Sequence, residues 1–441
     1  MDRSLLAAVS GIDANQTYLD TIGNNIANVN TVGYKQQSID FVDLLSEQIA
    51  GASAPPATAN AGAGINAVAV GSGVRVGAVS NDLSEGSLQQ TNQPNDVAIN
   101  GNGFLIAQQG GQQIFTRAGQ LTPDANGNLA TPTGGLIEGW QAVNGAVNSS
   151  APIGAVTIPA GQVIPANATT EITMGGNLPA WSGSGTATPV STTIHSYDAL
   201  GTTIPVTLTY TPVTGTADQW SVQGTATLPG GTTQNLWSTA TPPTVTFDPT
   251  TGQVSGITTN GVTPVPANAN GSFSLPVATM PAGYTFPPGD VWNIDFPPSG
   301  TAASFTQFAG QSTAGAVSQD GAAAGTLTSY SINASGMVVG SFSNGQTENI
   351  AQLALATFSN PGGLETIGNL DYVTTPNSGQ ASVGTPGTGG RGSLIGGSLE
   401  SSNVNLATQL TNLVIAQEAY QANTKVVQTD STVAQTLVQM A

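Results

Sequence analysis

One histidine and no cysteine limit the chemistry that this chain of 441 residues could carry out. Without cysteine the chain has no thiol nucleophile, and His195 alone cannot supply the imidazoles of a multi-histidine zinc site. The many serines do not occur in the G-x-S-x-G turn that exposes the nucleophile of a hydrolase. A lone histidine beside a predicted strand is far more often structural than catalytic. We therefore expect no catalytic residue, no cofactor and no metal site.

The run TPDANGNL places oxygen-bearing side chains at alternate positions, Asp124, Asn126 and Asn128, as the first part of a calcium-binding loop does. The glutamate that should complete such a loop several positions later is absent, and Gly127 is out of place. A β-turn accounts for the same residues. We interpret the run as a turn.

A secreted glycosidase remains an alternative, because it would combine two facing carboxylates with aromatic platforms for sugar rings. No spacing in the sequence excludes this interpretation, and a β-rich adhesin is a second alternative. The tryptophans that could form such platforms are Trp140, Trp181, Trp220, Trp237 and Trp292.

The composition indicates a β-rich, acidic protein of several domains. Glycine (56) and proline (27) are abundant, charged residues make up only 7%, and the formal net charge is −18. Such a charge excludes nucleic acid as a partner, since that would need clustered lysine and arginine. No segment approaches the ~20 apolar residues of a membrane span, and the start lacks the pattern of a cleaved secretory signal. Arg117 and Arg391 are isolated basic residues, which we expect to form structural ion pairs.

The two ends of the chain show helical spacing of apolar residues, which the interior does not. Between Asn405 and Met440 there is neither glycine nor proline, which is the strongest helix signal in the sequence. An apolar stripe on a lone helix needs a partner, because each fully buried leucine or isoleucine contributes roughly 1.5–3 kcal/mol. Packing on the chain's own body is one solution, and pairing with other copies is another. The residues predicted to make these contacts are Leu5, Ile12, Leu19, Ile22 and Ile26 in the first helix and Leu406, Leu410, Leu413, Tyr420 and Val427 in the second.

Between the ends we predict short strands, joined by turns rich in asparagine and glycine. The predicted fold is mainly β with α-helical termini, in which two discontinuous β-rich domains stack outward from paired, coiled-coil-like terminal helices. Two segments rich in small residues have the composition of mobile or extended linkers, which would detach the helices from the β body and favour a polymerisation element. The predicted parts are helical termini at 1–32 and 399–441, linkers at 33–75 and 376–398, an inner β domain at 76–148 and 300–375, and an outer β domain at 149–299.

At this point the sequence resembles a known family. The run GIDANQTYLDTIGNNIANVNTVGYK (11–35) is similar to the N-terminal motif of flagellar rod, hook and hook-associated proteins, and residues 397–440 resemble their C-terminal motif. Glu418 departs from the family, which commonly carries arginine there. We expect Asn24, Asn25 and Asn28 to cap and turn the end of the helix. The positions that carry the resemblance include Asn24, Asn25, Asn28, Gly33, Tyr34, Lys35, Asn403, Gln417 and Asn423.

The interior also resembles this family, and it indicates which of its members the chain is most similar to. DVAINGNGF (96–104) looks like the inner β domain of hook and distal-rod proteins, and HSYDALGTTIPVTLTY (195–210) resembles the start of the outer domain of hook proteins. The resemblance implies a structural subunit that self-assembles into a curved tube, a universal joint that transmits motor torque to the filament. A distal-rod or hook-associated protein is the alternative within the family.

The resemblance also implies a location and partners. Hook subunits leave the cell through the flagellar type III export apparatus without a cleaved signal peptide, so the expected location is extracellular, in the flagellar hook. Phe41 and Leu45 fit the spacing of the family's export-gate motif, although simple packing of this apolar segment explains them equally well. The implied partners are other copies of the chain, the rod at the base, the hook cap during growth, and the hook–filament junction proteins at the tip.

Overall fold

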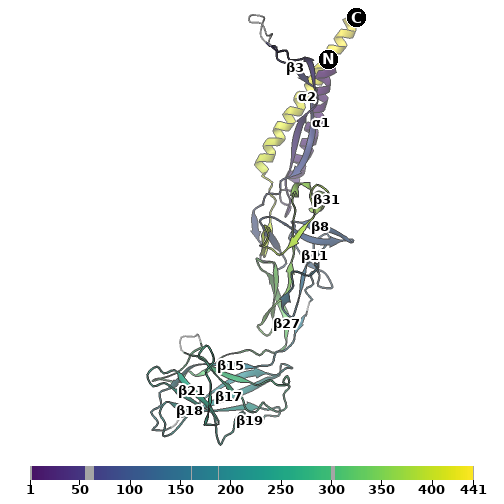
Figure 1. Cartoon of the computed structure of the whole chain (residues 1–441). Coiled ribbons are helices and arrows are strands. Elements are labelled where there is room, and N and C mark those ends of the chain that lie inside the picture. The colour runs from purple at the N-terminus through teal and green to yellow at the C-terminus, as the bar shows by residue number, and fades with distance from the viewer. Residues whose placement is uncertain (1, 55–63, 160, 187, 299–302, 441) are drawn as a thin grey trace. The chain divides into compact units, whose positions relative to one another are not determined.

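The computed structural model describes residues 2–54, 64–159, 161–186, 188–298 and 303–440. The chain begins with helix α1 (Asp2–Ala27) and ends with helix α2 (Leu406–Met440), and short strands fill the sequence between them (Figure 1). The predicted fold class, mainly β with helical termini, is confirmed. Asn405 caps α2 by accepting a hydrogen bond from the N–H of Thr408 over 3.2 Å.

The chain divides into two compact units, the first made of residues 1–160, 330–340 and 348–441 and the second of residues 161–329 and 341–347. The predicted domain limits differ from this division at both ends. Residues 149–159 belong to the first unit, where Val156 and Ile158 are buried. Strands after residue 303 return to the second unit, where Phe305 is fully buried. These limits have no marker in the sequence, because the same short strands continue across them.

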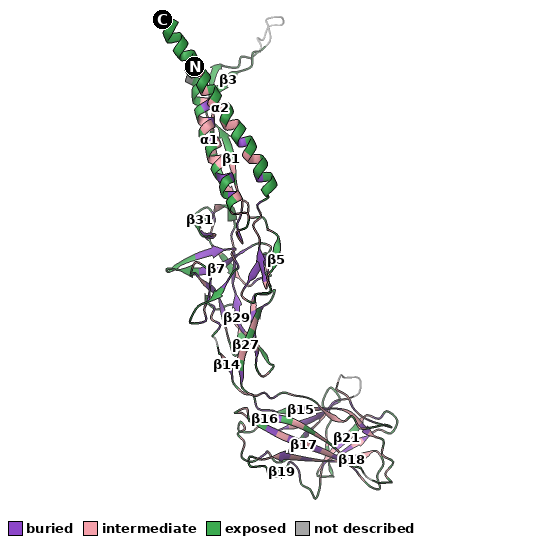
Figure 2. Cartoon of the chain, turned by 180° about the vertical axis from the view of Figure 1, so that it is seen from behind, coloured by how far each residue is buried: buried purple, intermediate pink, exposed green. Residues whose placement is uncertain are grey.

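The first unit contains the helices and most of a large sheet. Ring edges meet ring faces in its core, where Phe104 and Phe115 each contact Phe358. Strand β7, which carries Phe104, is largely buried (Figure 2). The division between the units falls within β27, β28 and β29. The principal strands of the sheet are β7 (Phe104–Gln109), β8 (Gln112–Thr116), β11 (Leu136–Val143), β27 (Gly325–Ile332), β28 (Met337–Phe342), β29 (Thr347–Leu353), β31 (Glu365–Gly368) and β32 (Asp371–Val373). Shorter strands at its margins are β9 (Thr122–Pro123), β10 (Leu129–Ala130), β12 (Ala146–Val147), β13 (Gly154–Ala155), β14 (Val163–Ile164), β30 (Leu355–Thr357) and β33 (Ser382–Gly384).

The described parts of the predicted linkers, expected to be mobile or extended until packed, include extended segments that pair as strands. Strand β1 (Gln37–Asp43) pairs with β4 (Val74–Asn81), and β2 (Ser46–Ala50) pairs with β3 (Val68–Gly71). On the other side of the chain, β34 (Ser393–Gly396) pairs with β6 (Val97–Asn100), and β35 (Ser398–Glu400) pairs with β5 (Leu88–Gln90). Their small side chains suit close strand pairing as well as they suit linkers. Residues 55–63 of the first predicted linker lie outside the described residues.

The second unit is a sandwich of two sheets around one hydrophobic core, so it forms a single domain. The core draws large side chains from both sheets, among them Tyr210, Trp220, Phe296 and Phe305. The five-stranded sheet consists of β15 (Glu171–Pro179), β23 (Phe273–Pro276), β24 (Asn293–Phe296), β25 (Phe305–Phe308) and β26 (Gly315–Gln319). The seven-stranded sheet consists of β16 (Val190–Tyr197), β17 (Thr203–Pro212), β18 (Gln219–Thr227), β19 (Thr233–Asn235), β20 (Thr244–Phe247), β21 (Val254–Thr259) and β22 (Thr263–Val265).

Candidate functional site

The two terminal helices pair in opposite directions. At one end of the pair, Ser4 donates a hydrogen bond to the carboxylate of Asp430 over 2.7 Å. At the other end, the amide of Asn25 meets the side-chain oxygen of Gln409 at 3.5 Å. Both chain ends therefore lie at the same end of the helix pair (Figure 1). Residues 431–440 of α2, which follow Asp430, are all exposed.

Small and polar side chains line the contact between the helices. Gly11 and Ala14 of α1 are buried, as are Gln409 and Ala416 of α2. A Cβ atom at Gly11 would lie 2.8 Å from the side-chain nitrogen of Asn423, so the helices approach closely there.

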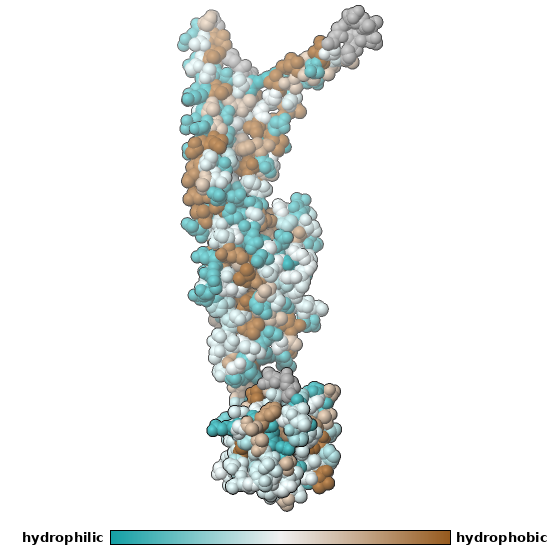
Figure 3. All heavy atoms as spheres, turned by 90° about the vertical axis from the view of Figure 1, so that its left-hand side faces the viewer, coloured by the Kyte–Doolittle hydropathy of each residue, from teal (hydrophilic) through white to brown (hydrophobic). Residues whose placement is uncertain are grey.

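Many of the larger apolar side chains of the two helices stay exposed. On α2, Leu406, Leu410 and Val414 follow one another at intervals of four residues with 44%, 47% and 53% of their surfaces exposed. Hydrophobic atoms accordingly appear on the surface of the helix pair (Figure 3). We call Leu406, Leu410, Val414 and Ile415 the α2 apolar stripe.

The predicted contact residues fall into three groups. Leu5, Leu406 and Leu410 are exposed. Ile22 differs from the prediction, because it is 1% exposed and packs inside the chain. The spacing of apolar residues in the sequence did not distinguish Ile22 from the predicted contact residues that stay exposed. The half-buried group consists of Ile12, Leu19, Ile26, Leu413, Tyr420 and Val427.

Asn25 ties the end of α1 to the first strand. Its side chain donates to the carbonyl oxygen of Gln37 over 2.8 Å and accepts from the N–H of Gln37 over 2.9 Å. The hydroxyl of Tyr34 donates to the same amide oxygen over 3.0 Å. Asn28 has the turn-forming role that was expected of it, because its side-chain nitrogen contacts both oxygens of Asn24 at 2.9 Å.

A buried cluster of charges joins the two terminal motifs to the β body. The ammonium of Lys35 donates to Glu400 and to the carbonyl oxygen of Ser84, each over 2.6 Å. The guanidinium of Arg117 lies 3.4 Å from the same carboxylate, which confirms the ion pair expected for Arg117. The three side chains are at most 4% exposed. Burial holds the pKa of Lys35 below its ordinary value, against the opposing effect of its hydrogen bond to Glu400.

Asn403 supplies a second junction between the ends of the chain. Its side-chain oxygen accepts from the N–H of Gln36 over 2.8 Å, and its side-chain nitrogen donates to the carbonyl oxygen of Asp82 over 2.8 Å. Nearby, Gly33 has a φ of 73° and donates its N–H to the carbonyl oxygen of Glu400 over 2.7 Å. A Cβ there would lie 3.1 Å from the backbone of Arg117, so the close approach requires glycine.

Glu400 is the residue that the sequence interpretation missed. The family motif was traced through residues on either side of it, and the signal that could have found it was the need of Lys35 and Arg117 for a counter-charge. Arg391 has no carboxylate partner among the described residues, contrary to the prediction, and its guanidinium instead donates to the carbonyl oxygen of Thr385 over 3.2 Å. Gln417 is exposed on α2.

Phe41 and Leu45 lie on and just after β1. The ring of Phe41 packs edge-on against Tyr18 of α1, with 5.7 Å between the ring centroids, and is 43% exposed. Leu45 is 85% exposed. Packing therefore accounts for Phe41 in part, and it does not account for Leu45.

Of the residues considered for chemistry, His195 is exposed on β16, and Asp124 belongs to a turn. Asp124 accepts hydrogen bonds from the N–H groups of Asn126 and Asn128, each over 2.8 Å, which describes a turn. Four of the tryptophans, Trp140, Trp220, Trp237 and Trp292, are at most 5% exposed and cannot serve as sugar platforms. Trp181 is half-buried, packs against the core of the second unit and donates its ring N–H to the carbonyl oxygen of Val213 over 2.8 Å. Within the described residues, no group of three or more acidic, histidine or cysteine side chains is placed to hold a metal ion. No helix in that part of the chain is long and apolar enough to cross a membrane.

Comparison with known families accounts for both ends and for most of the interior. Residues 5–35 match the flagella basal body rod protein family, and residues 395–440 match the flagellar basal body rod FlgEFG protein C-terminal family. Residues 98–177 match the flagellar hook protein FlgE/F/G D1 domain, and residues 179–322 match the flagellar basal body protein FlaE D2 domain.

Relatives that match this chain over its whole length are flagellar hook proteins. The chain is 36% identical to the flagellar hook protein FlgE of Treponema pallidum, and the match covers 100% of both chains. It is 33% identical to the FlgE of Borreliella burgdorferi, again over 100% of both, and 32% identical to that of Escherichia coli over 98% of both. A crystal structure of the Helicobacter pylori hook protein FlgE2 aligns with 69% of this chain and 98% of its own at 14% identity. Its TM-score of 0.46 is too low to carry an argument. The full-length relatives show that the chain belongs to the flagellar hook protein family, as a structural subunit of the hook and not an enzyme.

Proposed function

We propose that copies of this chain assemble through the outward surface of the paired helices, and that the resulting tube transmits motor torque to the filament as a curved universal joint. The helix pair would hold the subunits together. Contacts between β domains, which are polar and poor in charge, would shift as the tube bends and rotates.

One observation carries this proposal: the paired helices leave several of their larger apolar residues exposed, among them Leu406, Leu410 and Val414. Exposed apolar side chains at regular intervals on a helix favour burial against another surface, at about 25 cal/mol per Å² of apolar area removed from water. The α2 apolar stripe supplies such a surface, and Val433, Leu437 and Val438 add to it near the chain end.

The finer points of export and partners belong to the same proposal. We propose that the chain leaves the cell through the flagellar type III apparatus, with Phe41 and Leu45 as the export-gate motif, and reaches its place outside the cell without a cleaved signal peptide. In the growing hook it would contact the rod at the base, the hook cap, and the junction proteins at the tip.

The test is a charge placed on the α2 apolar stripe. Leu410→Glu should prevent tube formation by the purified chain in sedimentation and electron microscopy, because a carboxylate resists burial in an apolar contact. Thermal unfolding of the β domains should not change, since Leu410 is 47% exposed in the single chain. Gln421→Glu is the matched control, because Gln421 is exposed on the same helix and already polar. Normal tubes from Leu410→Glu would refute the proposed role of the stripe.

A further inference from the structure

The strands of the seven-stranded sheet in the second unit carry no carboxylate and no permanently charged side chain, and their one histidine, His195 on β16, is exposed on the same side as Ser191 and Thr193. Strands β16 to β22 contain no aspartate, glutamate, lysine or arginine. The other sheet of the same sandwich does carry charge, with Glu171 on β15 and Asp295 on β24. About a quarter of the residues in a typical soluble domain are charged, and most of these lie on its surface. The outward side of this sheet is half-buried along β17, β18 and β20 and exposed on β16, and its lack of carboxylate, lysine and arginine side chains needs an explanation.

The core-facing side of this sheet is apolar, and its other side is a continuous array of hydroxyl and amide groups. Burial alternates along β17 and β18, with Ile204, Val206, Leu208 and Tyr210 in the core. We call the opposite side the hydroxyl face; its residues include Ser191, Thr193, Thr207, Thr209, Thr211, Gln219, Ser221, Gln223, Thr225, Thr244 and Thr246.

Side chains of the hydroxyl face hydrogen-bond to one another across the strands. The hydroxyls of Ser191 and Thr209 lie 3.0 Å apart, and those of Thr193 and Thr207 lie 2.9 Å apart. On the next strands, the Thr244 and Thr258 hydroxyls are 2.6 Å apart. These internal partners reduce the number of directional hydrogen bonds that a surface laid against the face would form, and therefore the number that must break before that surface can move.

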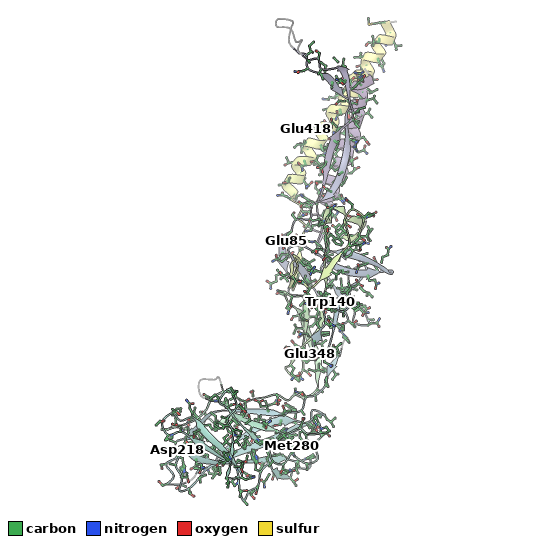
Figure 4. All side chains as sticks on the ribbon, in the orientation of Figure 1. Glu85, Trp140, Asp218, Met280, Glu348 and Glu418 are labelled. Atoms are coloured by element: carbon green, nitrogen blue, oxygen red, sulfur yellow. The ribbon has the colours of Figure 1, made fainter. Side chains whose placement is uncertain are left out.

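Charge determines which partner fits this face. Residues 161–329 and 341–347 contain seven acidic residues and no lysine or arginine, so two copies of the unit repel each other wherever their carboxylates meet. Asp198, Asp218 and Asp248 lie in the turns at the ends of the strands; Asp218 is labelled in Figure 4. The hydroxyl face is the broad surface on which a second acidic copy meets no like charge.

We propose that the hydroxyl face is where the second unit contacts another copy of this chain in the assembled hook. The inference rests on the proposed function, because it requires an assembled tube, and it names the surface that slides within it. A face that is polar, uncharged and internally hydrogen-bonded can stay against its neighbour while its register changes. Depletion of charged residues is also the compositional mark of the core of a protein interface.

Single thiols test this assignment, because the chain has no cysteine of its own. Ser191→Cys places one thiol on the hydroxyl face, and Ser318→Cys places one on β26 of the other sheet; both serines are exposed. Maleimide labelling of Ser191→Cys should slow at least about tenfold between the monomer and hooks seen in the electron microscope, because an interface core excludes solvent and reagent. Labelling of Ser318→Cys should change little.

Each outcome bears on the proposal. Equal labelling of Ser191→Cys in monomer and tube would overturn the assignment of the hydroxyl face while leaving the proposed helix contacts intact. Protection of Ser318→Cys instead would assign the contact to the other sheet and overturn it as well. A chain that forms no tube at all would overturn both this inference and the proposed function. As a second measurement, Ser191→Asp should weaken assembly in a way that added salt reverses, whereas Ser318→Asp should not.

Discussion

Lys35 and Glu400 form an ion pair of 2.6 Å with both side chains buried, although they lie 365 positions apart in the sequence. The pair joins the N-terminal motif to the strand that leads into α2. Arg117 adds a contact from the β body to the same carboxylate. The helices are therefore anchored to their own chain at a charged junction, and the linker segments that were expected to detach them are folded against it.

Removing the shared carboxylate should destabilise the first unit strongly. Glu400→Gln leaves the ammonium of Lys35 and the guanidinium of Arg117 buried without a counter-charge, a change that typically costs about 3–5 kcal/mol. Denaturant unfolding followed by Trp140 fluorescence would measure it, since Trp140 is the tryptophan of that unit. Glu418→Gln is the control, because Glu418 is exposed on α2 (Figure 4). A cost as small as that of the control would contradict the structural role of the cluster.

The close approach of the helices at Gly11 predicts opposite results for two glycines of α1. Alanine in place of glycine usually stabilises a helix by about 0.5–1 kcal/mol. Gly23→Ala should gain this, because a Cβ at Gly23 has no neighbour within 4 Å. Gly11→Ala should not, because its Cβ would press against Asn423 at 2.8 Å. Thermal unfolding followed by helical circular dichroism distinguishes the two, and equal stabilisation at both sites would count against the pairing register.

Leu45 offers a clean test of the export motif, because its side chain does not support the fold. Leu45→Asp should reduce the amount of chain that reaches the medium in cells with a working export apparatus, and it should leave the stability of the purified chain unchanged. Ile49→Asp is the matched control, since Ile49 lies four positions after Leu45 and the two side chains are 60% and 85% exposed. Equal export of both variants would contradict the proposed export motif, and packing against α1 would then be the role of Phe41.

Asp248 should make the second unit less stable in acid. Hydrogen bonds from the hydroxyl of Thr250 and from the N–H groups of Thr251 and Thr250 lower the pKa of Asp248 from the ordinary 3.8 to about 2. Because the folded pKa lies below the unfolded one, the contribution to stability is complete above the unfolded pKa and is lost as the pH falls through the folded pKa.

The measurement compares the wild type with Asp248→Asn, whose amide oxygen can still accept the hydrogen bonds of the turn. The free energy of unfolding of the wild type should fall relative to that of the variant between about pH 4 and pH 2. Fluorescence of the core residues Trp220 and Trp292 would report the unfolding. A difference between the two proteins that stays constant across this range would show that Asp248 does not titrate as the structure requires.

The helices were predictable because their sequence signals are local. The stretch without glycine and proline between Asn405 and Met440 matches α2 closely, whereas the predicted helical part at 399–441 began seven positions too early, over the end of β35. The linkers and domain limits were not predictable in the same way, because strand pairing between distant segments has no local signature. Phe305 shows this: its burial depends on β25 pairing with β15, more than a hundred positions earlier in the chain.

The candidate site was predictable only in part, for the same reason. The apolar residues of the helices were found by their spacing, yet spacing could not tell Ile22, which is buried, from Leu410, which is exposed. Whether such a residue is buried depends on which face of its helix packs against the rest of the chain. The spacing of apolar residues alone does not show which face that is. Glu400 was missed because its partners, Lys35 and Arg117, are close to it only after folding.

The antiparallel helix pair has a practical consequence for anyone who modifies this protein. Since both termini emerge at one end of the pair, next to exposed apolar residues such as Leu437 and Val438, an affinity tag or fluorescent fusion at either terminus would occupy the same neighbourhood. The turn at Gly230 and Gly231 is a better insertion point. Both glycines have positive φ, and a Cβ at either would have no neighbour within 4 Å, so a short epitope or dye-binding sequence could be placed there at a distance in sequence from either helix.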